Sequence, residues 1–158
     1  MKRVLDPCCG SRMMWFDKNN PDVEFCDNRE LHTTLCDGRV LNIEPDTLCD
    51  FTKLPFENNT FFHVVFDPPH FVSAGEASWT SKKYGHLPKN WRELLHDGFA
   101  ECMRVLKPNG TLIFKWNEYQ IPVREVISAI GYKPLYGHKS GKQQKTHWMA
   151  FIKEEEDD

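Results

Sequence analysis

The sequence predicts an α/β fold: a mostly parallel sheet of about seven strands, an antiparallel hairpin near the C-terminal end, and helices on both faces. Short runs of β-branched and aromatic residues alternate along the chain with segments of helical periodicity. This alternation is typical of parallel strands joined by crossover helices. The last two apolar runs are joined by a polar stretch too short for a crossover helix, which predicts an antiparallel pair.

In the N-terminal half the expected elements are strands at residues 2–6, 23–26 and 48–51 and a short helix at residues 11–18. Ser11 is a suitable N-cap for that helix because its hydroxyl can accept a bond from a free backbone N–H. The apolar residues 40–43 are harder to assign, since Pro45 follows them closely.

In the C-terminal half the expected elements are strands at residues 61–66, 111–116, 132–136 and 147–153 and helices at residues 91–106 and 122–130. The apolar positions of residues 91–106 follow helical spacing. Asn90 can cap this helix, and the Lys-Pro-Asn-Gly sequence at residues 107–110 closes it. Gly131 is the expected C-cap of the second helix.

Length and composition indicate one globular domain, residues 1–153, followed by an acidic disordered tail at residues 154–158. The chain has 158 residues, of which 40% are hydrophobic and 27% charged. The net charge is −3, and without the tail the rest of the chain is mildly basic. No apolar stretch reaches membrane-spanning length, and an early acidic residue argues against a signal peptide, so we expect a cytoplasmic protein with no membrane partner.

The six cysteines do not form a metal-binding pattern. They are Cys8, Cys9, Cys26, Cys36, Cys49 and Cys102. No two of them are spaced as Cys-x-x-Cys, and no His-x-x-x-His pair accompanies them. We therefore expect free thiols and no metal site.

The most informative motif follows the strand predicted at residues 61–66. Asp67, Pro68, Pro69 and His70 stop this apolar run abruptly, because proline lacks the N–H that a strand ladder needs. Asp67 is then held at the carboxyl end of a strand, which is where open α/β sheets bind ligands. Its carboxylate can accept hydrogen bonds from an amino group. Taken alone, the motif also fits an ordinary strand-ending turn.

A second motif lies at the start of the chain. The strand ending at Asp6 turns through Gly10 into the predicted helix, which directs backbone N–H groups toward a ligand. Asp27 ends the next strand at the distance expected of an acid that binds ribose hydroxyls. Asp50 and Phe51 follow the third predicted strand, where an acid and an aromatic ring can bind an adenine.

Together these motifs resemble the class I S-adenosylmethionine-dependent methyltransferases, over residues 2–153. The resemblance implies a Rossmann-like fold and S-adenosylmethionine as cofactor. It places at the methionine end of the cofactor Asp6, Cys8, Cys9, Gly10 and Ser11. It assigns the ribose to Asp27, with Asn28 adjacent, and the adenine to Asp50 and Phe51. A nicotinamide-binding loop usually has three glycines, whereas this loop has only Gly10, which disfavours a nicotinamide dinucleotide as the cofactor.

Within that family, Asp-Pro-Pro-aromatic is the signature of methyltransferases that act on amino groups. The resemblance implies transfer to an exocyclic amino nitrogen of a nucleic-acid base, with adenine in DNA the first choice. The Asp67 carboxylate and the Pro68 carbonyl would accept the two N–H bonds of the amino group, next to Pro69. His70 or Phe71 would stack on a flipped-out base.

Other functions remain open from the sequence alone. The acceptor could be an amino group in RNA or a protein glutamine, and the chain could be a non-catalytic cofactor-binding subunit. Nothing in the sequence resembles an added target-recognition domain, so a separate subunit is one way to supply recognition.

Two further segments could touch nucleic acid. Basic and aromatic residues alternate in the loop at residues 71–90, which suits phosphate contact with base stacking or an ordinary solvated loop. The basic segment at residues 138–145 fits an exposed hairpin loop better than a binding element. Lys115 and Asn117 end a strand near the same sheet edge, where a binding role is possible but an ordinary structural role is favoured.

Overall fold

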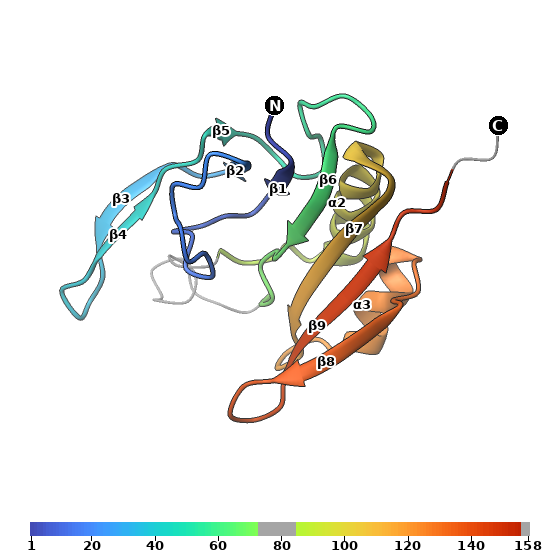
Figure 1. Cartoon of the computed structure of the whole chain (residues 1–158). Helices are drawn as coiled ribbons and strands as arrows, with labels where there is room; N and C mark the ends of the chain where they lie inside the picture. Colours follow the sequence, from blue (N-terminus) through green and yellow to red (C-terminus); the bar gives the residue numbers. More distant parts are fainter. Residues whose placement is uncertain (73–84, 156–158) are drawn as a thin grey trace.

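The computed structural model describes residues 1–72 and 85–155. Seven of the described strands form one sheet in the order β5-β2-β1-β6-β7-β9-β8, and β3 and β4 form a separate ribbon (Figure 1). The strands are β1 (Val4–Asp6), β2 (Val23–Asp27), β3 (Leu31–Thr34), β4 (Val40–Ile43), β5 (Thr47–Leu48), β6 (Phe61–Phe66), β7 (Leu106–Asn117), β8 (Tyr136–Ser140) and β9 (Thr146–Ile152). The described helices are α2 (Trp91–Val105) and α3 (Val123–Ile130), and neither is long and apolar enough to cross a membrane.

The sheet is parallel through its centre and antiparallel at one edge. β1 pairs in parallel with β2 and β6, and β6 pairs in parallel with β7. β9 runs antiparallel to both β7 and β8. The predicted sheet with its C-terminal antiparallel hairpin is therefore confirmed, and the carboxyl ends of β1, β2, β6 and β7 meet at one edge.

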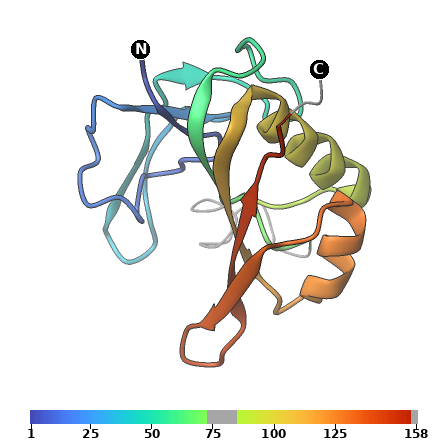
Figure 2. The same ribbon diagram turned by 45° about the vertical axis from the view of Figure 1, so that its right-hand side comes forward.

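The centre of the core lies between the sheet and α2. Phe66 of β6 and Phe114 of β7 stack with their ring centroids 5.4 Å apart, and Phe99 of α2 lies 6.0 Å from Phe114. All three side chains are fully buried, which contributes roughly 2–3 kcal/mol for each phenylalanine. α3 packs against α2 on the same face of the sheet (Figure 2).

The loop between β1 and β2 contains no helix, so the helix predicted at residues 11–18 is wrong. Gly10 and Arg12 have φ angles of 52° and 60°, in the left-handed region that a right-handed helix excludes. The Arg12 guanidinium donates hydrogen bonds to the backbone carbonyls of Lys18 and Glu44, at 2.6 Å each. One bond within the loop and one to a distant segment thus fix the loop in place of helical bonds.

The ribbon of β3 and β4 is an element that the sequence does not predict. Its apolar side chains form a small cluster of their own, in which Leu35, Leu41 and Ile43 are buried. The chain reverses near Gly38, whose φ of 86° suits a glycine. The ribbon accounts for the unassigned residues 40–43, and β5 is shorter than the predicted third strand.

The first strand of the last hairpin lies later in the sequence than predicted. A strand is predicted at residues 132–136, but β8 begins at Tyr136, which pairs with Ala150. The polar residues that follow are paired with β9 as far as Ser140, opposite Thr146. Pairing with a buried neighbour therefore overrides a local composition that is typical of a loop.

The helix ends follow the sequence prediction in part. Gly131 ends α3 with a φ of 75°, and its N–H donates to the Ile127 carbonyl at 3.2 Å, so the predicted C-cap is confirmed. Asn90 occupies the N-cap position of α2 but makes no side-chain capping bond. Residues 107–110 belong to β7, which follows α2 directly.

Gly98 is the point of closest approach between α2 and Phe51. A Cβ at this position would stand 2.3 Å from Phe51 Cδ2. We expect Gly98→Ala to lower the free energy of unfolding by about 1–3 kcal/mol, measured by urea denaturation, because the ring or the helix must shift. Alanine is the better helix former by about 1 kcal/mol, so a variant as stable as the wild type would contradict this packing.

Candidate functional site

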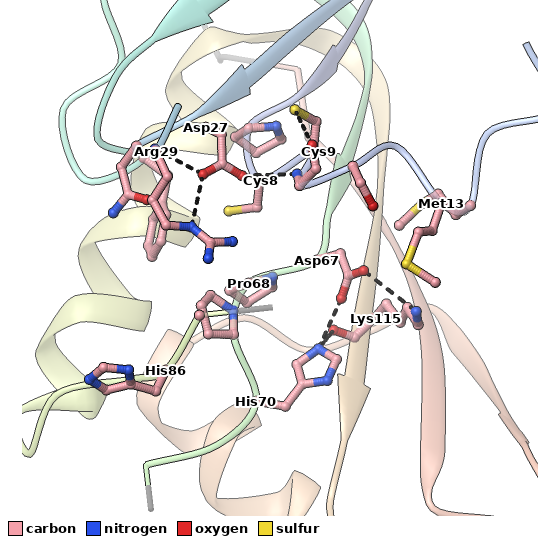
Figure 3. Close-up of a pocket in the computed structure, with 18 of the residues that line it drawn as sticks. Cys8, Cys9, Met13, Asp27, Arg29, Asp67, Pro68, His70, His86 and Lys115 are labelled. Atoms are coloured by element: carbon pink, nitrogen blue, oxygen red, sulfur yellow. Dashed lines mark hydrogen bonds and ion pairs between the residues drawn. The ribbon is translucent and has the colours of Figure 1, made fainter. Parts of the chain in front are cut away.

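A cavity of about 780 Å³ opens at the sheet edge where the parallel strands end (Figure 3). Its size is that of a small-molecule site. Most of the site residues predicted from the sequence line it: Cys8, Cys9, Gly10, Ser11, Asp27, Asn28, Phe51, Asp67, Pro68, Pro69, His70 and Phe71. Asp6 and Asp50 do not line it.

Asp6 is fully buried beneath the loop after β1. Its carboxylate accepts hydrogen bonds from the Cys8 backbone N–H at 3.2 Å and from Trp15 Nε1 at 2.7 Å. Burial raises the pKa of Asp6 to about 7, against the lowering effect of the Trp15 bond. In this structure Asp6 shapes the loop and does not face the cavity.

Asp27 ties the loop after β1 to the end of β2. One carboxylate oxygen accepts the Gly10 N–H at 2.9 Å, and the other accepts the Arg29 N–H at 3.0 Å. The Arg29 guanidinium also lies 3.5 Å from this second oxygen (Figure 3). The carboxylate is thus held rigidly in the wall of the cavity, beside the loop backbone.

Phe51 and Asp50 are placed differently although they are adjacent in sequence. Phe51 is buried and lies edge-on to Phe66, with 5.3 Å between ring centroids, while part of it lines the cavity. The exposed Asp50 accepts hydrogen bonds at 2.8 Å from the N–H and the hydroxyl of Thr52. Phe51 therefore forms a cavity wall, and Asp50 closes the turn that follows β5.

Asp67 follows β6 directly and is followed by Pro68, whose ring restricts the backbone at this point. His70 Nε2 lies 2.9 Å from one carboxylate oxygen, and Lys115 Nζ lies 3.5 Å from the other (Figure 3). The Asp67 side chain is 15% exposed, and it lines the cavity. The carboxylate is thus oriented by two side chains from different elements.

His70 faces inward. Its Nε2 is also 3.2 Å from the Lys115 backbone carbonyl. The carbonyl and the Asp67 carboxylate can only accept, so Nε2 carries a hydrogen that these two oxygens share. The ring packs 4.9 Å from the Trp116 ring. Phe71 comes next in the cavity wall, and its carbonyl accepts the Leu87 N–H at 2.7 Å.

Residues outside the predicted set also line the cavity: Pro7, Met13, Met14, Arg29, Leu31, Gly85, His86, Lys115, Asn117 and Thr146. For Lys115 and Asn117 the sequence favours an ordinary structural role over binding, yet both lie at the end of β7 and line the cavity. Leu31 comes from the unpredicted ribbon, and Thr146 is brought in by the register of β9. Among these residues, the usable sequence signals are the strand-end position of Lys115 and Asn117 and the place of Gly85 and His86 in the loop at residues 71–90.

The greater part of the predicted loop at residues 71–90 lies outside the described residues, which resume at Gly85. Within the described ranges, no group of three or more His, Cys, Asp or Glu side chains is arranged to hold a metal ion. The six cysteines are free thiols.

No protein-family model and no curated protein sequence matches the chain. Solved structures do match it over nearly its whole length. A protein of Pyrococcus horikoshii OT3 is 18% identical with a TM-score of 0.60, and the match covers 97% of this chain and 82% of that one. A Leishmania major SAM-dependent methyltransferase is 14% identical with a TM-score of 0.57, covering 97% of this chain and 65% of the other.

A Thermus thermophilus 16S rRNA N2 G1207 methyltransferase, solved with AdoMet and guanosine, is 15% identical with a TM-score of 0.52. That match covers 99% of this chain and 36% of the other. The fold is that of the class I S-adenosylmethionine-dependent methyltransferases. The fold expected from the sequence motifs is thereby confirmed.

The raised pKa of Asp6 predicts a pH-dependent stability. Unfolding returns this carboxyl from a pKa of about 7 to 3.8, so the unfolded chain releases its proton first. The contribution of Asp6 to the free energy of unfolding is therefore present below about pH 4 and is lost as the pH rises toward 7. Asp6→Asn should flatten urea-unfolding stability against pH by up to about 1.4 kcal/mol per unit.

The control is Asp97→Asn, an exposed carboxylate on α2. Its pH profile should run parallel to that of the wild type. If Asp6→Asn also runs parallel, Asp6 titrates normally in the folded protein.

Proposed function

We propose that this protein is an S-adenosylmethionine-dependent methyltransferase that acts on an exocyclic amino nitrogen of a nucleic-acid base, adenine in DNA being the first candidate. One observation carries the proposal. The Asp67 carboxylate at the carboxyl end of β6 faces the same cavity as the loop after β1 and Asp27. A methyl donor and an amino acceptor would therefore meet in one chamber.

The chemistry of the cavity wall fits the cofactor. Asp27 offers a buried carboxylate to ribose hydroxyls, in the place where this fold ends its second parallel strand. Phe51 and Leu31 provide apolar surface suited to an adenine ring. The backbone between Cys8 and Ser11 would contact the methionine end. When bound, S-adenosylmethionine supplies a methyl group on a sulfonium, which an amino nitrogen can attack.

Asp67 and Pro68 would prepare that nitrogen. The lone pair of an exocyclic amino group is delocalised into its ring, so the nitrogen is a poor nucleophile. A carboxylate and a backbone carbonyl that accept its two N–H bonds draw the lone pair out of the ring and aim it at the methyl group. No strong base is required, because the proton leaves after the methyl group has been transferred.

His70 and Phe71 would divide the roles beside the acceptor. His70 donates to the Asp67 carboxylate and packs on Trp116, so it holds the carboxylate in orientation. Phe71 lies next in the cavity wall and is the better candidate to stack on a flipped-out base.

An amino group in RNA or in a protein glutamine would use the same acceptors, and a cofactor-binding subunit without activity would use none. These alternatives differ in what becomes labelled when S-adenosylmethionine carries a labelled methyl group. The assay therefore offers unmethylated DNA, RNA and protein in separate arms.

Asp67→Ala should reduce methyl transfer by about 100-fold or more while cofactor binding persists, because it removes an acceptor used at the reacting nitrogen. Asp97→Ala removes an exposed carboxylate from α2 and should transfer at the wild-type rate. Full turnover by Asp67→Ala would exclude the assigned role. Label only in RNA or protein would replace the DNA assignment, and no label in any arm would favour the non-catalytic subunit.

A further inference from the structure

The β8–β9 hairpin concentrates positive charge beside the cavity. Between Tyr136 and Trp148 the chain contains three lysines, two histidines and no acidic residue. The lysines are Lys139, Lys142 and Lys145. All three are exposed, and within the described part of the chain none of them lies within ion-pair distance of a carboxylate.

Glu118, which directly follows β7, already has a partner in the hairpin. Its Oε1 lies 2.9 Å from Nε2 of His147, beside the turn. The bond to His147 lowers the pKa of Glu118, and Lys139 contributes a smaller lowering at longer range. The tip therefore keeps its positive charge.

The lysines stand on a defined turn. Gly141 and Gln144 have φ angles of 90° and 55°, and the Gln144 N–H donates to the Gly141 carbonyl at 3.2 Å. At the base of the turn the Glu118 N–H donates to the Lys145 carbonyl at 2.9 Å. A fixed turn presents its charges at a constant spacing, which lowers the entropy cost of binding a partner.

The hairpin is continuous with the cavity. Thr146 follows Lys145 directly, lines the cavity and accepts a hydrogen bond from Asn117 Nδ2 at 3.2 Å. The Lys115 ammonium group lies 3.5 Å from Asp67 Oδ2 and 5.3 Å from the centre of the Trp148 ring of β9. Lys115 therefore lies between Asp67 and the hairpin. The tip projects past the carboxyl end of β7 (Figure 1). Positive charge thus extends from the cavity to the tip.

Exposed aromatic rings occur on β8 and just after β7. Tyr136 at the start of β8 is 70% exposed, and Tyr119, two residues after β7, is 69% exposed. Trp148 is held by a bond from its Nε1 to Ser140 Oγ at 3.1 Å. This part of the sheet thus exposes tyrosines on β8 and just after β7 in addition to the lysines of the turn. That combination suits a polymer that offers both phosphates and bases, whereas an acidic protein or an anionic membrane would use only the charges.

We propose that the β8–β9 hairpin binds the phosphate backbone of the nucleic-acid strand whose base enters the cavity, with Lys139, Lys142 and Lys145 as the phosphate contacts. The inference rests on the proposed function for the identity of the polymer. It adds a binding element outside the cavity, and so assigns to this short chain a means of holding its substrate. Such contacts position the strand without reading its sequence.

The test is the salt dependence of binding of the full chain to a fluorescently labelled DNA duplex, measured by anisotropy. The triple variant Lys139→Gln, Lys142→Gln, Lys145→Gln should bind at least about tenfold more weakly at low salt. Its slope of log K against log salt should be shallower by about 2–3, because three phosphate contacts are lost.

The matched control removes the same charge elsewhere, as Lys18→Gln, Lys53→Gln, Lys133→Gln, all exposed positions outside the hairpin. It should keep the wild-type slope, and thermal melts should show both triple variants folded. Equal slopes for the two triple variants would overturn the inference, as would binding to polyglutamate or anionic vesicles as tight as binding to DNA.

The two proposals fail in different ways. Hairpin-dependent binding of DNA that is never methylated would remove the proposed function and leave the hairpin inference standing. DNA methylation with an unchanged KM in the hairpin variant would remove the hairpin inference and leave the proposed function standing.

Discussion

The Asp27 carboxylate joins the loop after β1 to the carboxyl end of β2, and the cavity is built around this junction. One oxygen holds the Gly10 N–H and the other holds the Arg29 N–H. The loop has no helix of its own, so side chains must support it. Trp15 bonds to the buried Asp6, and Arg12 reaches the Glu44 carbonyl just before β5. The loop is thereby fixed with its backbone along the cavity wall.

Three carboxylates gather at this sheet edge, and their surroundings separate their roles. Asp27 faces Arg29, and Asp67 faces Lys115. In the described part of the chain Asp6 has no cationic partner. Burial, with smaller contributions from the charges of Asp67 and Asp27, raises its pKa. Asp27 and Asp67, which line the cavity, are thus paired with cationic side chains. Asp6, beneath the loop, is buried without a counter-charge.

Local sequence signals predicted the parts of the structure that depend on neighbours in the chain. The strand at residues 61–66 has the predicted bounds, because an apolar run and two prolines define both ends. The acids and glycine at the strand ends were found by their spacing. The helix predicted at residues 11–18 is wrong because this segment depends on a distant contact. Arg12 bonds across 32 residues to Glu44, which keeps its loop from forming a helix. Leu31 and Thr146 reach the cavity only through strand pairings that composition does not reveal.

We propose that the cavity around Asp27 binds S-adenosylmethionine. The decisive measurement is calorimetric titration of the protein with S-adenosylmethionine, with Asp27→Ala as the variant. We expect saturable binding by the wild type and an affinity lower by about tenfold or more in the variant, because a charged hydrogen-bond acceptor is removed. No binding at millimolar cofactor, or equal affinity in the two proteins, would show that Asp27 does not form a cofactor site.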